Sequence, residues 1–94
     1  MELFWTPEAK QDREHIYDYI EADNPVAALK LDELFAKNAE HLLAHPSLGR
    51  VGRVKGTREL VVHPNYILIY DLAGDSVRVL RVVHSARQWP SAKR

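Results

Sequence analysis

"RELVVHPNYILIYDLAGDSVRVLRVVH", residues 58–84, decides the fold, because most of it suits β-strands joined by tight turns. It contains three runs rich in β-branched and aromatic residues, which are Arg58–His63, Tyr66–Leu72 and Ser76–His84. The links between them, Pro64–Asn65 and Ala73–Asp75, are short enough for hairpin turns. Three consecutive strands joined in this way predict an antiparallel meander.

The residues before the meander predict one short strand and two helices. Leu3–Trp5 suits a strand, and Thr6 can cap the helix that follows it. Asn24, in the triplet Asp23–Pro25, both ends that helix and caps a second one that runs to Ala44. Apolar residues recur at helical spacing in both segments: Ile16, Tyr19, Ile20, Ala27, Leu31, Leu34, Phe35 and Leu42. We therefore expect an α+β fold in the order β-α-α-β-β-β, with a helical hairpin packed on a small, mostly antiparallel four-stranded sheet.

Length and composition indicate a single folded domain over residues 1–94. The chain is 46% hydrophobic, which is typical of globular proteins, and it has no apolar run long enough for a membrane span. The absence of cysteine excludes disulfides and thiolate metal sites. The N-terminus lacks the pattern of a signal peptide, so we expect a cytoplasmic protein.

The net charge of zero conceals a division between the two halves of the chain. Residues 1–46 hold ten Asp and Glu against four Lys and Arg, a net charge of −6. Residues 47–94 hold nine Lys and Arg against three acids, a net charge of +6. This division predicts a surface that meets an anionic partner. The alternative is that helices simply carry more acidic residues than strands.

The second half begins with a basic loop, "GRVGRVKGTR", residues 49–58. It places Arg50, Arg53, Lys55 and Arg58 within ten residues without an acid. Such a cluster suits phosphate groups and predicts a nucleic-acid or other anionic partner. A solvated loop without a ligand is the alternative.

His84 ends the last predicted strand. Strict alternation places it on the same side as Arg78 and Val82, with Arg81 on the opposite side. With Arg87 three residues later, His84 could exchange a proton while a guanidinium stabilises phosphate charge. The alternative is a structural histidine that tethers the C-terminal tail.

Aromatic and histidine side chains suggest two further kinds of site. Tyr66, Tyr70 and Trp89 could stack on bases, although tyrosines in small sheets usually pack in the core. His41 and His45 have the spacing of a zinc pair, but no nearby residue completes the site. We expect neither a metal nor a cofactor.

Three segments, "LAHPSLGR" (43–50), "GTRELVVHPNYILIYDL" (56–72) and "VRVLRVVHSARQWP" (77–90), resemble toxins of type II toxin–antitoxin modules. The family is the RelE/ParE superfamily, and the resemblance is closest to its RelE/StbE branch with YacB-like toxins. It covers essentially the whole chain. The resemblance implies the same β-α-α-β-β-β fold. It also implies a growth-arresting toxin that a neighbouring antitoxin keeps silent.

The superfamily contains two activities. RelE-like members enter the ribosomal A site and cut mRNA, whereas ParE-like members poison DNA gyrase without nuclease chemistry. Ribosome-dependent mRNA cleavage is our first expectation. The resemblance then implies catalytic roles for His84, Arg58 and Arg87 and RNA-binding roles for Lys55, Arg53, Arg50 and Tyr66. Glu59 is a weaker proton acceptor, because strand alternation separates it from Arg58.

One departure from the RelE pattern keeps two alternatives open. Some RelE nucleases carry an arginine at or near Ile67, and this chain has none there. In the gyrase alternative, Arg58, Arg87 and Trp89 would be contact residues and His84 would be structural. In the other alternative, the chain is an inactive module that only binds its antitoxin and acts in operon autoregulation.

Overall fold

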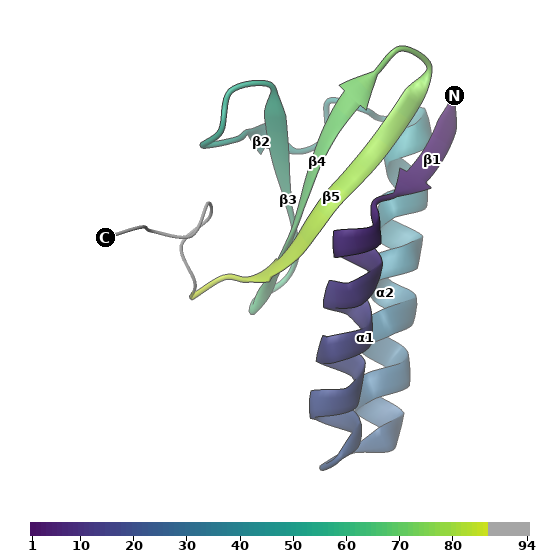
Figure 1. Cartoon of the computed structure of the whole chain (residues 1–94), viewed down its shortest axis with the longest axis vertical. Helices are drawn as coiled ribbons and strands as arrows, with labels where there is room; N and C mark the ends of the chain where they lie inside the picture. The colour runs from purple at the N-terminus through teal and green to yellow at the C-terminus, as the bar shows by residue number, and fades with distance from the viewer. Residues whose placement is uncertain (87–94) are drawn as a thin grey trace.

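The computed structural model of the protein describes residues 1–86, and residues 87–94 lie outside the described part. Its elements are β1 (Glu2–Trp5), α1 (Pro7–Glu21), α2 (Pro25–Ala44), β2 (Arg50–Val51), β3 (Thr57–His63), β4 (Tyr66–Ala73) and β5 (Ser76–His84). The described strands form one five-stranded sheet in the order β1-β5-β4-β3-β2 (Figure 1). β1 is parallel to β5, and the other pairs are antiparallel. The predicted α+β order is confirmed, and the two-residue β2 adds a fifth strand within the basic loop.

Both helices begin at the predicted caps. The Thr6 hydroxyl accepts a hydrogen bond from the Ala9 N–H at 3.1 Å, and the Asn24 side chain accepts one from the Ala27 N–H at 3.1 Å. Thr6 also donates its hydroxyl to the Leu80 carbonyl at 2.9 Å, which joins the start of α1 to β5. Neither of the two described helices is long and apolar enough to cross a membrane.

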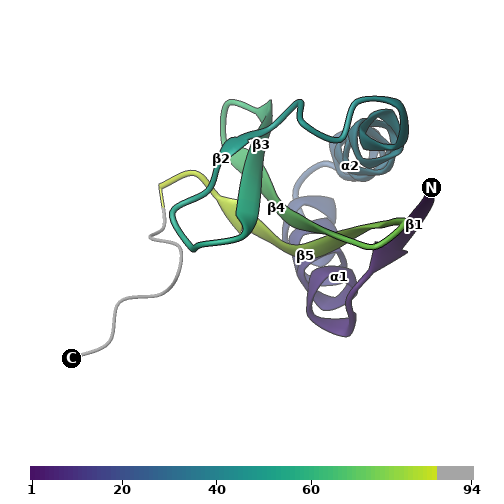
Figure 2. The ribbon, with the colours of Figure 1, turned by 90° about the horizontal axis from the view of Figure 1, so that it is seen from above.

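The helical hairpin covers one face of the sheet (Figure 2). Side chains from α1, α2, β4 and β5 fill the space between the layers, and those less than 2% exposed include Ala9, Phe35, Ala39, Leu42, Leu68, Tyr70, Val77 and Val79. The hairpin runs past the turn that joins β3 to β4, so its far half lacks a sheet beneath it (Figure 1). That overhang is where a functional site can form.

A β-bulge changes which side chains of β5 face the helices. β5 holds one residue more than β4 at this point, and Leu80 has no partner in the register. The extra residue reverses the alternation along the strand. Val82 and His84 therefore lie on the helix-facing side, whereas Arg78 pairs with Asp71 and lies on the opposite side. The expectation that Arg78 shares a side with His84 is wrong, because strict alternation does not survive a bulge.

Asp12 of α1 closes the edge of β5 beyond the bulge. β1 ends opposite Val79, so the rest of β5 would otherwise expose its backbone. The Asp12 carboxylate accepts hydrogen bonds from the Val82 N–H at 2.9 Å and from the Arg81 guanidinium at 2.7 and 3.1 Å. These bonds raise the pKa of Arg81 despite its partial burial, so the guanidinium stays charged.

We predict that Asp12→Ala lowers the free energy of unfolding by about 2–4 kcal/mol. The substitution leaves the Val82 N–H without its acceptor and removes the carboxylate that binds the partly buried Arg81 guanidinium. Asp18→Ala, at an exposed position of the same helix, is the control and should change stability by about 0.5 kcal/mol or less. Urea unfolding measures both variants, and equal effects would contradict the role given to Asp12.

Candidate functional site

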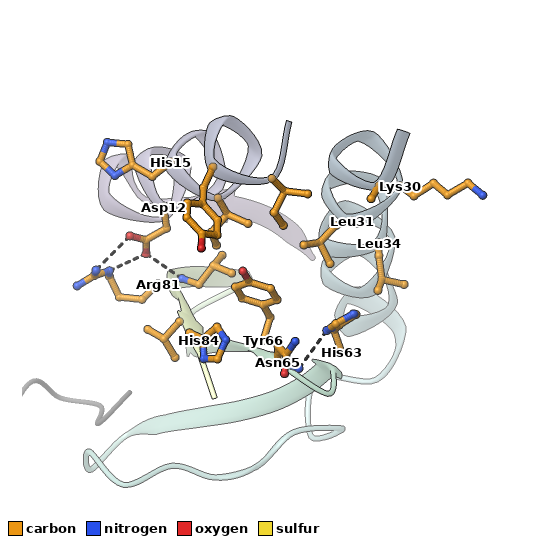
Figure 3. A pocket seen from close by; sticks show the side chains of 16 residues that line it. Asp12, His15, Lys30, Leu31, Leu34, His63, Asn65, Tyr66, Arg81 and His84 are labelled. Carbon is orange, nitrogen blue, oxygen red and sulfur yellow. Dashed lines mark hydrogen bonds and ion pairs between the residues drawn. The ribbon is translucent and has the colours of Figure 1, made fainter. Parts of the chain in front are cut away.

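A cleft of about 1090 Å³ opens under the overhang of the hairpin (Figure 3). α1, α2 and the neighbouring ends of β3, β4 and β5 form its walls. The apolar lining includes Ile16, Ile20, Leu31, Leu34 and Val82. The polar lining is Asp12, His15, Lys30, His63, Asn65, Arg81 and His84. An apolar floor with a polar border is the usual composition of a binding site.

Two histidines flank Tyr66 in one row of the sheet. The register pairs Tyr66 with His63 on β3 and with His84 on β5. The ring of Tyr66 lies 5.8 Å from that of His63 and 5.3 Å from that of His84, centroid to centroid (Figure 3). Phe35 contacts the same ring edge-on at 5.5 Å, and Tyr66 is only 9% exposed. Stacking needs an open ring face, so these contacts favour a packing role, and base stacking on Tyr66 stays a prediction.

The hydrogen bonds of the two imidazoles fix where each neutral ring carries its proton. His84 Nδ1 accepts the Ala86 N–H at 3.0 Å, and His63 Nδ1 accepts the Asn65 N–H at 3.0 Å. A neutral ring that accepts at Nδ1 carries its hydrogen on Nε2. Within residues 1–86, each ring thus has an Nε2–H donor left for a ligand. In this arrangement Nε2 of His84 cannot take up a proton as a general base.

The structure does not bring Arg58 to His84. Arg58 pairs with Tyr70, four residues along β4 from the row that contains His84, which is roughly 13 Å along the strands. The Arg58 guanidinium donates instead to the Gly49 carbonyl at 2.7 Å. Arg58 is therefore held at the start of the basic loop, away from the cleft.

Tyr70 fixes the chain between α2 and the basic loop. Its buried hydroxyl donates to the Pro46 carbonyl at 2.7 Å and accepts the Gly49 N–H at 2.9 Å. A Cβ atom at Gly49 would lie 2.7 Å from the Tyr70 ring, so only glycine fits there. The tyrosine thus has a structural role and offers no face to a base.

Glu59 organises the basic loop from the opposite face of the sheet. Its carboxylate accepts the Arg53 backbone N–H at 3.0 Å and the Arg50 guanidinium at 3.0 and 3.3 Å. Burial alone would raise the pKa of Glu59, but these hydrogen bonds and the two positive charges outweigh it, so the pKa is lowered. Arg50 is paired, while the side chains of Arg53 and Lys55 are exposed.

Several predicted roles concern residues outside the described part of the chain, a metal ion, or binding and catalysis. Arg87 and Trp89 lie outside the described residues, so their roles stay predictions. Within residues 1–86, no group of three side chains could hold a metal ion. The catalytic and RNA-binding roles of His84, Arg58, Arg50, Arg53 and Lys55 also stay predictions.

Sequence reasoning missed several polar residues of the cleft, among them Asp12 and His63. The sequence does hold a signal for His63. It lies two residues before the turn residue Asn65, whose N–H it accepts, just as His84 lies two residues before Ala86. Asp12 has no local signal, since its partners on β5 are about 70 positions away in the chain.

We predict that Glu59→Gln destabilises the protein at pH 7 by about 1–3 kcal/mol, the usual range for hydrogen bonds to charged groups. A carboxylate with a lowered folded pKa stabilises the fold above its unfolded pKa, near 4.3, and loses this effect as pH falls through the folded pKa. The gap between wild type and variant should therefore shrink from pH 7 to pH 3. Urea unfolding at both pH values tests this, with exposed Glu40→Gln as control. A gap that does not change with pH would contradict it.

Comparison with known proteins gives one family and the same fold. The model of the family described as "ParE toxin of type II toxin-antitoxin system, parDE" matches residues 3–89. The protein Y4kP of Sinorhizobium fredii is 39% identical over 87 residues, covering 92% of this chain and 90% of its own length. Toxin RelE2 of Caulobacter vibrioides is 35% identical over 86 residues, covering 92% and 97%.

Solved structures agree with this match. A chain of the chromosomal ParDE system from P. aeruginosa superposes with a TM-score of 0.80 and 27% identity, over 89% of this chain and 95% of that chain. YafQ from E. coli superposes with a TM-score of 0.57 and 23% identity, over 89% and 92%, and at that identity it shows the fold alone. The chain thus belongs to the ParE toxin family of type II toxin–antitoxin systems, within the RelE/ParE superfamily.

Proposed function

We propose that this toxin arrests growth by binding its target without cutting RNA, as ParE-like members do with DNA gyrase, and that an antitoxin silences it. The observation that carries the proposal is the separation of the expected catalytic groups. His84 lies at the cleft with its neutral-state proton on Nε2, and Arg58 is held at the basic loop.

RNA cleavage by attack of a ribose 2′-OH requires several groups at one phosphate. A proton acceptor, a proton donor and cations must converge where charge develops. In residues 1–86, Arg58 is bound to a backbone carbonyl, Arg50 is paired with Glu59, and Tyr66 is buried. These contacts favour a binding function over the expected nuclease set.

The exposed positive charges of the basic loop favour a target that carries negative charge. Arg53 and Lys55 are exposed beside Gly56, whose backbone has φ of +85° at the tip of the loop. Gyrase bound to DNA presents phosphates that such cations can neutralise. The TM-score of 0.80 with a ParDE chain, against 0.57 with YafQ, favours the same target.

The antitoxin is the second proposed partner. Solved relatives include the ParDE system and the E. coli DinJ–YafQ toxin–antitoxin complex. We extend this association to the present chain, with the toxin held silent in a hetero-oligomer until the antitoxin is lost. A gyrase target places its action in the cytoplasm.

Ribosome-dependent mRNA cleavage is the second candidate, and one observation favours it. The imidazole of His84 is half-buried rather than sealed, and the Arg81 guanidinium lines the same cleft. In this candidate Arg81 and Arg87 would supply charge near His84, and the basic loop would follow the mRNA backbone on the ribosome.

The two candidates differ in which synthesis stops first after inducible expression. We predict that thymidine incorporation falls before methionine incorporation, that transcripts stay intact, and that the purified toxin inhibits supercoiling by gyrase. His84→Ala, purified and shown to fold, is the matched variant for the cleavage candidate. Early loss of methionine incorporation with cut transcripts, both abolished by His84→Ala, would support mRNA cleavage and refute the proposal. No growth effect of the wild type would indicate the inactive antitoxin-binding module.

A further inference from the structure

We infer that the face of the sheet turned away from the helical hairpin binds the protein target, through an apolar patch of that target with acidic residues around it. The existence of such a target rests on the proposed function. The place and the chemistry come from three aliphatic side chains on neighbouring strands and from the arginines on the same face.

Three aliphatic side chains form one row across this outer face. The register pairs Val61 of β3 with Ile67 of β4, and Ile67 with Val83 of β5. Their neighbours along the strands pack in the core beneath the helices and are Leu60, Val62, Leu68 and Val82. Because side chains alternate along a strand, the row Val61–Ile67–Val83 points away from the helices. We call these three residues the outer row.

The outer row is accessible and continuous. Val61 is 54% exposed, and Ile67 and Val83 are half-buried. Neighbouring strands lie about 4.8 Å apart, so the row covers roughly 10 Å of apolar surface across three strands. Single exposed apolar residues are common on soluble proteins, but adjacent ones bordered by polar groups mark an interaction surface.

The exposed charge on the same face is positive. Glu59 binds the Arg50 guanidinium, and Asp71 binds that of Arg78. The acid is the more buried partner in both pairs: the Arg50 side chain is 61% exposed against 9% for Glu59, and that of Arg78 is 43% against 18% for Asp71. A partner therefore meets guanidinium groups, which bind carboxylates with charge-assisted hydrogen bonds.

A protein with an apolar centre and an acidic rim matches this face better than two other partners do. In a second copy of the chain, the same exposed arginines would meet their own kind and repel. Nucleic acid could bring phosphates to the arginines, but the branched aliphatic side chains of the outer row offer no ring on which a base stacks. Burial of that row favours a partner with apolar side chains of its own.

Charge substitutions of two exposed valines test the inference. Val61 lies in the outer row, whereas Val51 is 78% exposed and pairs with Arg58, on the side of the sheet that faces the helices. The probe is purified gyrase, titrated with the full-length toxin. We expect Val61→Glu to weaken binding about tenfold or more, since it sets a carboxylate against an acidic partner. Val61→Lys and Val51→Glu should each change the Kd by about threefold or less, because the first keeps an apolar stem and the sign of the face, and the second leaves the face unaltered.

Methyl NMR of the wild-type toxin gives a second readout that needs no variant. Gyrase should broaden or shift the methyl signals of Val61, Ile67 and Val83 and leave those of Val51 unchanged. Urea unfolding of each variant in parallel shows whether a loss of binding reflects the surface or the fold.

Other results would overturn the inference. Changes in the methyl signals of Ile20 and Leu31 instead would place the target in the cleft. Changes in the outer row caused by duplex DNA alone, or by raising the toxin concentration alone, would assign the face to nucleic acid or to a second copy. Equal weakening by Val61→Glu and Val61→Lys would contradict an acidic partner. A wild type that neither binds nor inhibits gyrase would refute the proposed function and the inference with it, whereas inhibition with an unchanged outer row would refute the inference alone.

Discussion

The bond between the Asp12 carboxylate and the edge of β5 is the contact on which the cleft depends. β1 is too short to cover β5 beyond Val79, and the bulge at Leu80 turns the rest of that strand toward the helices. Asp12 satisfies the exposed Val82 N–H and the Arg81 guanidinium together. The same contact keeps α1 beside β5, so the space under the hairpin stays open as a cleft.

The sequence alone suggests that the positive charges of the second half form one surface for an anionic partner. In the folded protein, several of them pair with acidic residues instead. Arg81 of the basic half pairs with Asp12 of the acidic half, and Arg78 and Arg50 pair with acids of the sheet itself. Among the described residues, three of the nine cations counted in residues 47–94 are thus paired within the fold. The exposed cations Arg53 and Lys55 and the donors at the cleft are separate features, and they suit separate partners.

Local sequence signals predict most of the fold, but they do not predict the arrangement of the functional site. The caps at Thr6 and Asn24 and the hairpin turn at Gly74 act over a few residues, so the sequence predicts them. The bulge at Leu80 depends on the pairing of β5 with β4, which no local pattern reports. The expected meeting of Arg58 with His84 failed for the same reason, since register decides how far apart strand residues lie.

The proton positions on His63 and His84 test the account most directly, because they separate a recognition border from a catalytic base. Two-dimensional ¹⁵N NMR of the imidazole nitrogens reports the tautomer of each neutral ring. We predict hydrogen on Nε2 and an unprotonated Nδ1 in both histidines, as their bonds to the Asn65 and Ala86 N–H groups require. Hydrogen on Nδ1 of His84, with Nε2 free to accept a proton, would contradict it and restore the nuclease mechanism.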